Sequence, residues 1–99
     1  MTYVVTWRYV IGDEKVADEQ VAVARPVWLK QGATSLRCYV VGSGPNIGQW
    51  IIAVEFPDAQ TFGRAQDAVR QSAEFKSWTA ANRAAKNISV DCSHLRERS

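Results

Sequence analysis

The sequence predicts a single α+β domain in which a four-stranded antiparallel sheet carries its helices on one face. Its 99 residues suffice for one domain with one modest core. Segments that alternate apolar and polar residues are separated by segments of helical periodicity, in the order strand, helix, strand, strand, helix, strand. Right-handed crossovers then place the two strands of each strand–helix–strand half parallel, with both helices on the same side. This is the ferredoxin-like βαββαβ sandwich.

The first half of the chain supplies two strands and one long helix. Residues 4–11, VVTWRYVI, alternate as a strand, and Asp13 follows as the expected N-cap of a helix. The apolar residues of this helix recur at a spacing of 3.6 residues, and Gly32 ends it. Pro26 lies inside the pattern, where the missing backbone donor is expected to kink the helix. The β-branched and aromatic run at residues 36–41 is the second strand.

The second helical segment is predicted to be broken in two. Its first apolar stripe is followed by Phe75 and Trp78, which fall about half a turn out of phase with that stripe. One straight helix cannot bury both sets of side chains. A break is therefore expected near Ser72, which would cap a shorter second helix. Strands at residues 50–56 and 88–95 precede and follow this segment.

Both faces of the predicted sheet carry apolar side chains, although a small antiparallel sheet usually has one wet face. The more apolar face, which includes Trp7 and Tyr9, is expected to lie under the helices. The other face combines aliphatic side chains with Arg8 and Glu55, which could pair across the two central strands. Each buried aliphatic side chain contributes roughly 1.5–3 kcal/mol, and no element of the chain remains to cover this face.

The sequence therefore predicts a two-fold homodimer in which the sheets of two subunits face each other. Such an interface would bury on the order of 1,600 Å². The alternative is a monomer with a half-polar sheet face exposed to solvent.

Composition and charge argue against several classes of function. The chain is 46% hydrophobic and 22% charged, as in an ordinary globular protein, and its net charge of +2 is not gathered into a basic stripe. The strand at residues 50–56 lacks the paired aromatic residues of an RNA-recognition sheet. No apolar run approaches the ~20 residues of a membrane span. No secretory signal precedes the first strand, so the expected location is cytoplasmic.

Metal binding and nucleophilic catalysis find little support in the sequence. Cys38 and Cys92 lack CxxC spacing and are predicted to lie in the two outer strands, beyond disulfide reach within one subunit. The single histidine, His94, cannot make a His-rich metal site. We expect neither a metal ion nor a cofactor.

The four tryptophans of this short chain are predicted to turn toward the space between the sheet and the helices. They either fill a small core or form the walls of a pocket for a flat apolar ligand. Thr79 and Asn82 share a helical face with Phe75 and Trp78, and a polar group on an inner face needs a partner. Ligand, water or backbone could each be that partner. The candidate substrate-binding residues are Trp7, Trp28, Trp50, Phe75, Trp78 and Thr79.

Three residues are candidates for catalysis. Asn82 could steer the substrate, and Tyr9 could stabilise a phenolate-like or enolate intermediate through its hydroxyl group. His94 could transfer protons at the mouth of the pocket. Each has a structural alternative, which is local backbone bonding for Asn82, packing with a wet tip for Tyr9, and a surface position at a strand end for His94.

The chain resembles the dimeric α/β-barrel superfamily, and within it the antibiotic-biosynthesis-monooxygenase-like and NIPSNAP-like small proteins. The resemblance covers essentially the whole length and rests on VVTWRYVIGDEKVADEQ, GQWIIAVEFPDAQTF and SAEFKSWTAANRAA. The superfamily includes cofactor-independent oxygenases of aromatic polyketides, haem-degrading oxygenases, lactone isomerases, polyketide cyclases and many proteins without known activity. The resemblance implies a fold and a homodimer, and a fold does not settle the chemistry.

Two positions argue against the haem-degrading branch. Its members carry an asparagine in the first strand where this chain aligns Trp7, and an iron-ligating histidine on the last helix where this chain has Thr79. The polyketide-oxygenase branch uses tryptophan, asparagine, tyrosine and arginine around an aromatic substrate, with no metal or flavin. This chain offers residues of such types on the matching elements, namely Trp7, Tyr9, Trp78 and Asn82.

The leading hypothesis is a small homodimeric protein that binds an apolar or aromatic small molecule and, if it is an enzyme, acts as a cofactor-independent monooxygenase. One alternative is a non-catalytic dimerisation or ligand-sensing module with a filled core. Another is an isomerase or cyclase that uses the same pocket. An interior opening of ~300 Å³ or more would favour a ligand site over a filled core.

Overall fold

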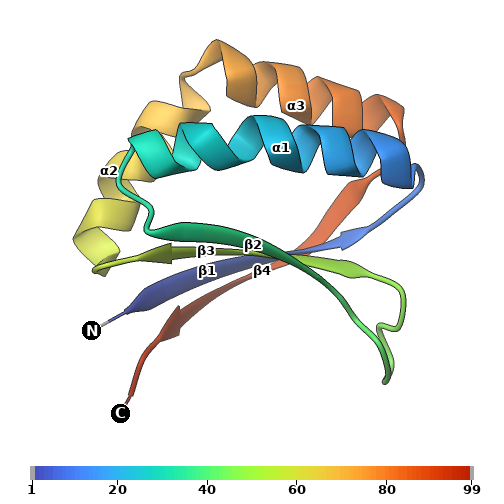
Figure 1. Cartoon of the computed structure of the whole chain (residues 1–99), viewed down its shortest axis with the longest axis horizontal. Helices are drawn as coiled ribbons and strands as arrows, with labels where there is room; N and C mark the ends of the chain where they lie inside the picture. Colours follow the sequence, from blue (N-terminus) through green and yellow to red (C-terminus); the bar gives the residue numbers. More distant parts are fainter. Residues whose placement is uncertain (1, 99) are drawn as a thin grey trace.

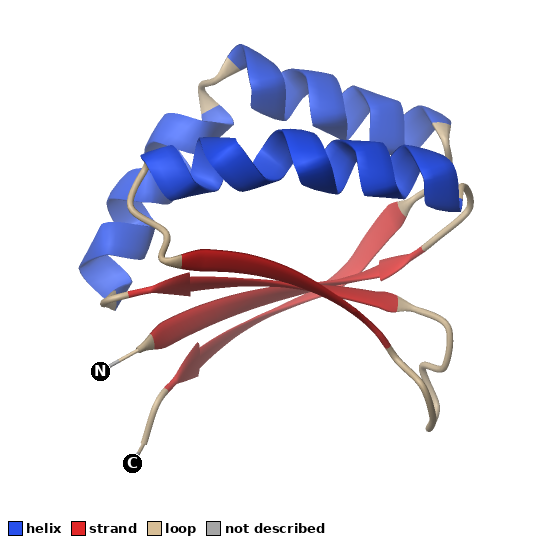
Figure 2. Ribbon diagram, viewed as in Figure 1, coloured by secondary structure: helices blue, strands red, loops and turns tan. Residues whose placement is uncertain are grey.

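The computed structural model describes residues 2–98, which form a layer of helices over one face of a sheet (Figures 1 and 2). In chain order the elements are β1 (Tyr3–Val10), α1 (Glu14–Lys30), β2 (Ser35–Val40), β3 (Trp50–Phe56), α2 (Ala59–Arg70), α3 (Ala73–Ala84) and β4 (Ile88–Arg96). This order confirms the predicted ferredoxin-like succession of strands and helices. No helix among the described residues is both long and apolar enough to cross a membrane.

The four strands form one antiparallel sheet in the order β2-β3-β1-β4. The central strands are β1 and β3, as predicted, and Val5 of β1 lies opposite Val54 of β3. The outer strands β2 and β4 carry Cys38 and Cys92, and both cysteines are free thiols. The chain termini lie at the same end of the sheet, on the neighbouring strands β1 and β4 (Figure 1).

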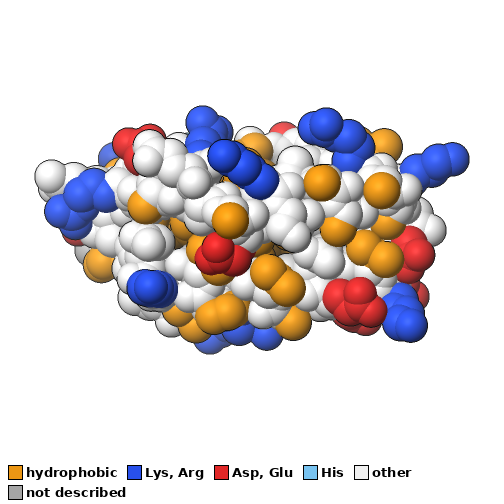
Figure 3. All heavy atoms as spheres, turned by 90° about the horizontal axis from the view of Figure 1, so that it is seen from above, with side chains coloured by type: hydrophobic (Ala, Val, Ile, Leu, Met, Phe, Trp, Pro, Cys, Tyr) orange, Lys and Arg blue, Asp and Glu red, His pale blue; other side chains and the backbone are white. Residues whose placement is uncertain are grey.

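The core lies where the helix-facing side chains of β1 and β3 meet the inner faces of the helices. Val5, Val54 and Phe56 are fully buried. The Phe56 ring contacts Phe62 of α2 edge to face, with their centroids 5.3 Å apart, and Trp28 of α1 completes this aromatic cluster. Aromatic pairs of this kind add to the stabilisation that comes from burial alone. The outer surface of the helices, in contrast, carries scattered acidic and basic side chains (Figure 3).

The break in the second helical segment is confirmed at Ser72. The Ser72 hydroxyl accepts a hydrogen bond from the backbone N–H of Phe75 at 3.1 Å, and donates one to the carbonyl oxygen of Val69 at 2.6 Å. One side chain thus ends α2 and begins α3. The change of direction lets Phe62 and Val69 of α2 and Trp78 of α3 all face the core.

The long helix α1 begins at the predicted cap and continues past its proline. The Asp13 carboxylate accepts from the backbone N–H of Val16 at 3.1 Å, and the helix extends through Pro26 to Lys30. Gly32 then adopts a φ of +113°, a left-handed conformation that glycine enters without steric cost. The chain reverses there into β2.

The predicted pairing of Arg8 with Glu55 is wrong. The register of the central strands places Arg8 opposite Ile51, so Glu55 lies about 13 Å farther along β3. Arg8 instead pairs with Asp91 of β4, with 3.6 Å between their charged atoms, and it donates a hydrogen bond to Gln49. These contacts hold Arg8 over the face of the sheet that the helices leave open.

Candidate functional site

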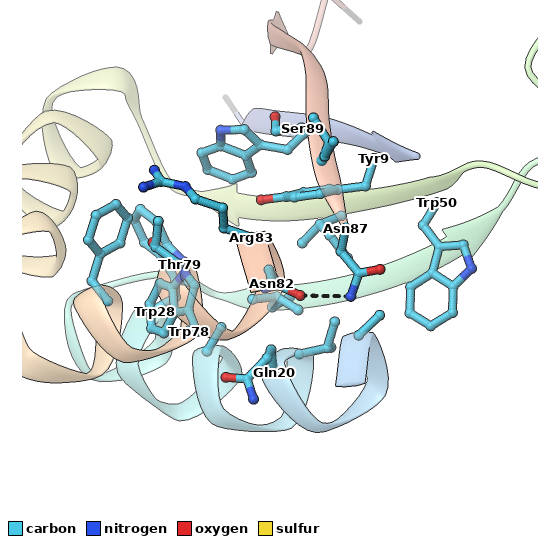
Figure 4. Close-up of a pocket in the computed structure, with 18 of the residues that line it drawn as sticks. Tyr9, Gln20, Trp28, Trp50, Trp78, Thr79, Asn82, Arg83, Asn87 and Ser89 are labelled. Atoms are coloured by element: carbon cyan, nitrogen blue, oxygen red, sulfur yellow. Dashed lines mark hydrogen bonds between the residues drawn. The ribbon is translucent and has the colours of Figure 1, made fainter. Parts of the chain in front are cut away.

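A cavity of about 600 Å³ lies between the helices and the sheet (Figure 4). Its lining comes from all four strands and all three helices, and exposed lining residues such as Arg83 and Ser89 mark its mouth. The volume falls within the range of about 300–1,000 Å³ that is usual for small-molecule sites. The interior is therefore not filled by side chains, which favours a ligand site over a closed core.

Every sequence-predicted substrate-binding residue lines this cavity. Aromatic side chains form most of its apolar wall, and they support one another through ring contacts. The rings of Trp7 and Trp28 have centroids 5.7 Å apart, and those of Phe75 and Trp78 have centroids 5.4 Å apart. The full predicted set in the wall is Trp7, Trp28, Trp50, Phe75, Trp78 and Thr79. Since several of these rings also belong to the core, the tryptophans pack the interior and border the opening at once.

Asn87, in the turn between α3 and β4, is the most tightly held polar side chain of the site, and the sequence analysis missed it. It is buried, and its Oδ1 accepts from the backbone N–H groups of Gly12 at 2.8 Å and Asp13 at 2.9 Å. Its Nδ2 donates to the Asp13 carbonyl oxygen and to Oδ1 of Asn82, both at 3.1 Å (Figure 4). The close approach requires Gly12, since a Cβ there would lie 2.6 Å from the Ala85 carbonyl oxygen.

This hydrogen-bond network fixes the orientation of the Asn82 amide group at the cavity. All the hydrogen-bonding capacity of the Asn87 amide is used, and the bond to Asn82 engages the oxygen of that amide. The Asn82 Nδ2 group makes no hydrogen bond to another described residue. Asn82 therefore offers the cavity a hydrogen-bond donor of fixed orientation.

Tyr9, the second predicted catalytic residue, also lines the cavity. Burial raises the pKa of its phenol, and the neighbouring Cys92 raises it further when ionised. The Tyr9 hydroxyl has no hydrogen-bond partner among residues 2–98. It is therefore a neutral donor near neutral pH rather than a base.

Two arginines that the sequence analysis did not select complete the polar lining. Arg83 lies in the last turn of α3, and Arg70 ends α2. Burial and Asp91 raise the pKa of the Cys92 thiol of β4, and Arg70 offsets part of this rise. The lining contains no aspartate, glutamate, lysine or histidine. Arginine in the last turn of a helix is a common surface feature, so only the tertiary structure reveals these two as cavity residues.

His94 does not line the cavity, so its predicted place at the pocket mouth is wrong. The register pairs it with Val5, about 16 Å along β4 from Ser89 at the mouth. Its Nδ1 is hydrogen bonded to the Tyr3 hydroxyl at 2.7 Å, and its ring meets the edge of Phe62. A contact of this kind holds the imidazole against α2, away from any cavity ligand.

The pairing of β4 with β1 contains an irregularity near the mouth of the cavity. The register shifts between Arg8 and Tyr9 of β1, so that Tyr9 lies opposite Ser89 and Trp7 lies opposite Cys92. An extra residue in one strand reverses the alternation of side chains beyond it. Ser89 therefore lines the cavity beside Ile88, and Val90 does not.

No metal-binding cluster is present in the described part of the chain. Among residues 2–98, no three or more His, Cys, Asp or Glu side chains lie close enough together to bind an ion. The polar groups that the cavity does offer are amide, hydroxyl and guanidinium groups. Their chemistry is hydrogen bonding and charge stabilisation.

Comparisons with known proteins show the fold. No protein-family model matches the sequence, and no curated protein matches it. The structure is similar to SnoaB, a cofactor-independent oxygenase from Streptomyces nogalater, at 16% identity and a TM-score of 0.63, covering 99% of this chain and 94% of that one. A proposed antibiotic biosynthesis monooxygenase from Bordetella bronchiseptica is 16% identical with a TM-score of 0.70, covering 99% and 98%. A NIPSNAP-like domain protein from Burkholderia xenovorans is 12% identical with a TM-score of 0.70, covering 99% and 86%.

These likenesses confirm the resemblance to antibiotic-biosynthesis-monooxygenase-like and NIPSNAP-like proteins at the level of the fold. A shared fold at such low identity leaves the chemistry to the residues of the cavity.

Proposed function

We propose that this protein binds a flat aromatic molecule in the cavity between sheet and helices and acts on it as a cofactor-independent monooxygenase. The observation that carries this proposal is the cavity of about 600 Å³, bordered by all four tryptophans and by the oriented donor of Asn82. Aromatic walls bind flat rings without demanding a particular substituent, while a small number of polar groups fix the orientation. The structural similarity to a cofactor-independent oxygenase supports the proposed reaction class.

In such a reaction the substrate itself must supply the electrons that reduce oxygen. When a methylene group between two aromatic rings becomes a carbonyl group, one oxygen atom of O2 is retained and the other leaves as water with the two methylene hydrogens. Asn82 Nδ2 and the Tyr9 hydroxyl would donate hydrogen bonds to an enolate or phenolate oxygen as negative charge develops there. Because the cavity lining holds no conventional base, the favoured substrates are those acidic enough to ionise without one.

The function is tested first by binding. Because all four tryptophans border the cavity, titration with anthrones, quinones and lactones should quench or shift the tryptophan fluorescence. Replacing Ala24, a lining residue of α1, by phenylalanine should fill the space and abolish the change. The matched control is Ala22→Phe, at an exposed position of the same helix that does not line the cavity. If no compound alters the emission of the unmodified protein, the ligand-site proposal is overturned.

Oxygen uptake separates the enzyme from the principal alternative. A monooxygenase should consume one O2 for each substrate molecule oxidised, in the absence of added flavin or metal. Binding without oxygen uptake would instead favour a non-catalytic ligand-sensing module, an alternative consistent with the lack of an acid or base in the lining. An isomerase or cyclase needs such a group, and His94 lies outside the cavity.

We also propose a homodimer in which two subunits cover each other's open sheet face. Apolar side chains on or beside that face are exposed, including Val10 at 43%, Tyr39 at 50% and Leu95 at 51%. The same face carries a small hollow of about 160 Å³ around the Arg8–Asp91 ion pair. A second copy would bury this surface, which the helices of one subunit do not reach.

A further inference from the structure

The charged side chains that line the cavity are all positive, and this bias indicates a class of ligand. Among the described residues that line it, Arg70 and Arg83 alone are charged. Within residues 2–98, neither guanidinium group has a carboxylate within 4 Å, and Arg8–Asp91 is the one ion pair found. Two unpaired positive charges beside an apolar, partly enclosed space raise the local concentration of anions.

Two uncharged groups of the cavity, from Asn82 and Tyr9, can also donate hydrogen bonds to a ligand. Asn82 precedes Arg83 on α3, and its amide oxygen accepts a hydrogen bond from Asn87, which leaves the Nδ2 group free to donate to a ligand. The hydroxyl of Tyr9 is a neutral donor whose raised pKa keeps its proton in place. Figure 4 shows Arg83 with Thr79 and Asn82 on the part of α3 that lines the cavity. The remaining lining groups, the amides of Gln20 and Gln66 and the hydroxyls of Thr79 and Ser89, can donate as well as accept.

We propose that the ligand is an aromatic carboxylate, with its ring system between the tryptophans and its carboxylate group at the cavity mouth on Arg83. A guanidinium group matches the two oxygens of a carboxylate with two parallel N–H bonds. Asn82 Nδ2 then provides a further donor on the same side. This inference rests on the proposed binding function, and it names the chemical class that the site selects.

The test compares two ligands that differ only in charge, anthraquinone-2-carboxylate and anthraquinone-2-carboxamide. Charge-assisted hydrogen bonds make the carboxylate the tighter ligand by about 10- to 100-fold at low salt, measured by calorimetry or tryptophan fluorescence. The preference should shrink as sodium chloride is added, because a charge pair at an exposed mouth is screened. Affinity for the carboxamide should stay nearly constant over the same salt range.

Substitution of Arg83 tests whether this residue supplies the positive charge that binds the carboxylate group. Arg83→Gln should reduce the carboxylate-to-carboxamide preference to within about threefold, chiefly by weakening carboxylate binding, because it removes the charge and keeps a polar side chain. Arg64→Gln, at an exposed position of α2 that does not line the cavity, is the matched control and should keep the full preference. Both positions are exposed, and circular dichroism establishes that each variant is folded.

The outcomes separate this inference from the proposed function. If the carboxamide binds as tightly as the carboxylate, or if Arg83→Gln keeps the full preference, the anionic ligand on Arg83 is overturned while the aromatic ligand site stands. If neither anthraquinone nor any neutral aromatic compound binds, the ligand site itself is overturned.

Discussion

A single carboxamide, that of Asn87, joins three parts of the chain that are distant in sequence. Its oxygen holds the start of α1 through the backbone N–H groups of Gly12 and Asp13, and its nitrogen orients Asn82 on α3. The same side chain therefore closes the turn between α3 and β4 and prepares the donor that faces the cavity. Stability and ligand orientation are linked at this residue.

Replacing Asn87 by alanine should lower the free energy of unfolding by about 2–3 kcal/mol. The substitution leaves part-buried backbone donors of Gly12 and Asp13 without an acceptor, and unmade hydrogen bonds of this kind are costly. Urea denaturation measures the change. Asn46→Ala is the control, because the Asn46 side chain, in the loop between β2 and β3, makes no hydrogen bond to another described residue; it should change stability by less than about 0.5 kcal/mol. Equal losses in the two variants would contradict the role assigned to Asn87.

Tyr9 should make the protein less stable at alkaline pH. Burial raises the pKa of Tyr9 in the folded state above its ordinary value of about 10. The unfolded chain therefore loses this proton first, and the free energy of unfolding falls as pH rises above about 10 through the folded-state pKa. Tyr9→Phe should flatten that part of the stability profile, measured by denaturation between pH 8 and pH 11. Tyr39→Phe, which removes an exposed hydroxyl group, is the matched control, and an identical response from both variants would disprove the assignment.

At the scale of elements, the join between α2 and α3 depends on Ser72. Ser72→Ala should cost about 1 kcal/mol, because it removes the N-cap of α3 and the bond to the Val69 carbonyl oxygen. Ser72→Asp, which keeps an acceptor for the Phe75 N–H, should recover most of the loss. Ser77→Ala, at an exposed position within α3, controls for the change of residue type. A Ser72→Ala variant as stable as the Ser77→Ala variant would show that packing alone sets the join.

The sequence predicts helices and strands well wherever the periodic pattern of apolar residues is long enough to be recognised. The half-turn offset of Phe75 and Trp78 was sufficient to predict the break at Ser72, since no single helix can bury both stripes. The alternation in β4 is less informative, because Ser89 and Cys92 face the same side only through a shift of register with β1. Such a shift is decided by pairing between strands, which one strand's sequence does not contain.

The candidate site was predictable in its apolar part and much less so in its polar part. Large aromatic side chains turn inward because their burial is favourable wherever they lie on the apolar side of a helix or strand. The tryptophan walls of the cavity can therefore be predicted from composition and periodicity. Asn87 looks like an ordinary turn residue, and Arg83 looks like an ordinary helix-terminal cation, until the fold brings them to one opening. The cavity itself depends on how far the helices stand from the sheet, which is a property of the whole packed structure.

The whole molecule has two unlike surfaces. The outer side of the helical layer is mixed in charge (Figure 3), whereas the open sheet face carries exposed apolar side chains around one ion pair. An antiparallel sheet can leave one face in water when that face is polar. Here the centre of the face is Ala53 of β3, which lies between Thr6 of β1 and Arg37 of β2. The small side chain of Ala53 at the centre allows a second sheet to approach closely.

A dimer built on this face should be dissociated by a charge at its centre. Sedimentation equilibrium at micromolar concentration should give the unmodified protein twice its chain mass of 11.0 kDa. Ala53→Arg should give the mass of one chain, because two-fold symmetry would bring two buried, unpaired guanidinium groups together, and such charges cost several kcal/mol each. Ala80→Arg, at an exposed position of α3, is the matched control and should remain dimeric.

Since the cavity opens on the other side of the sheet, monomeric Ala53→Arg should retain ligand binding if one subunit forms the whole site. An unmodified protein that sediments as a single chain would mean that the open face is stable in water and that the dimer proposal is wrong.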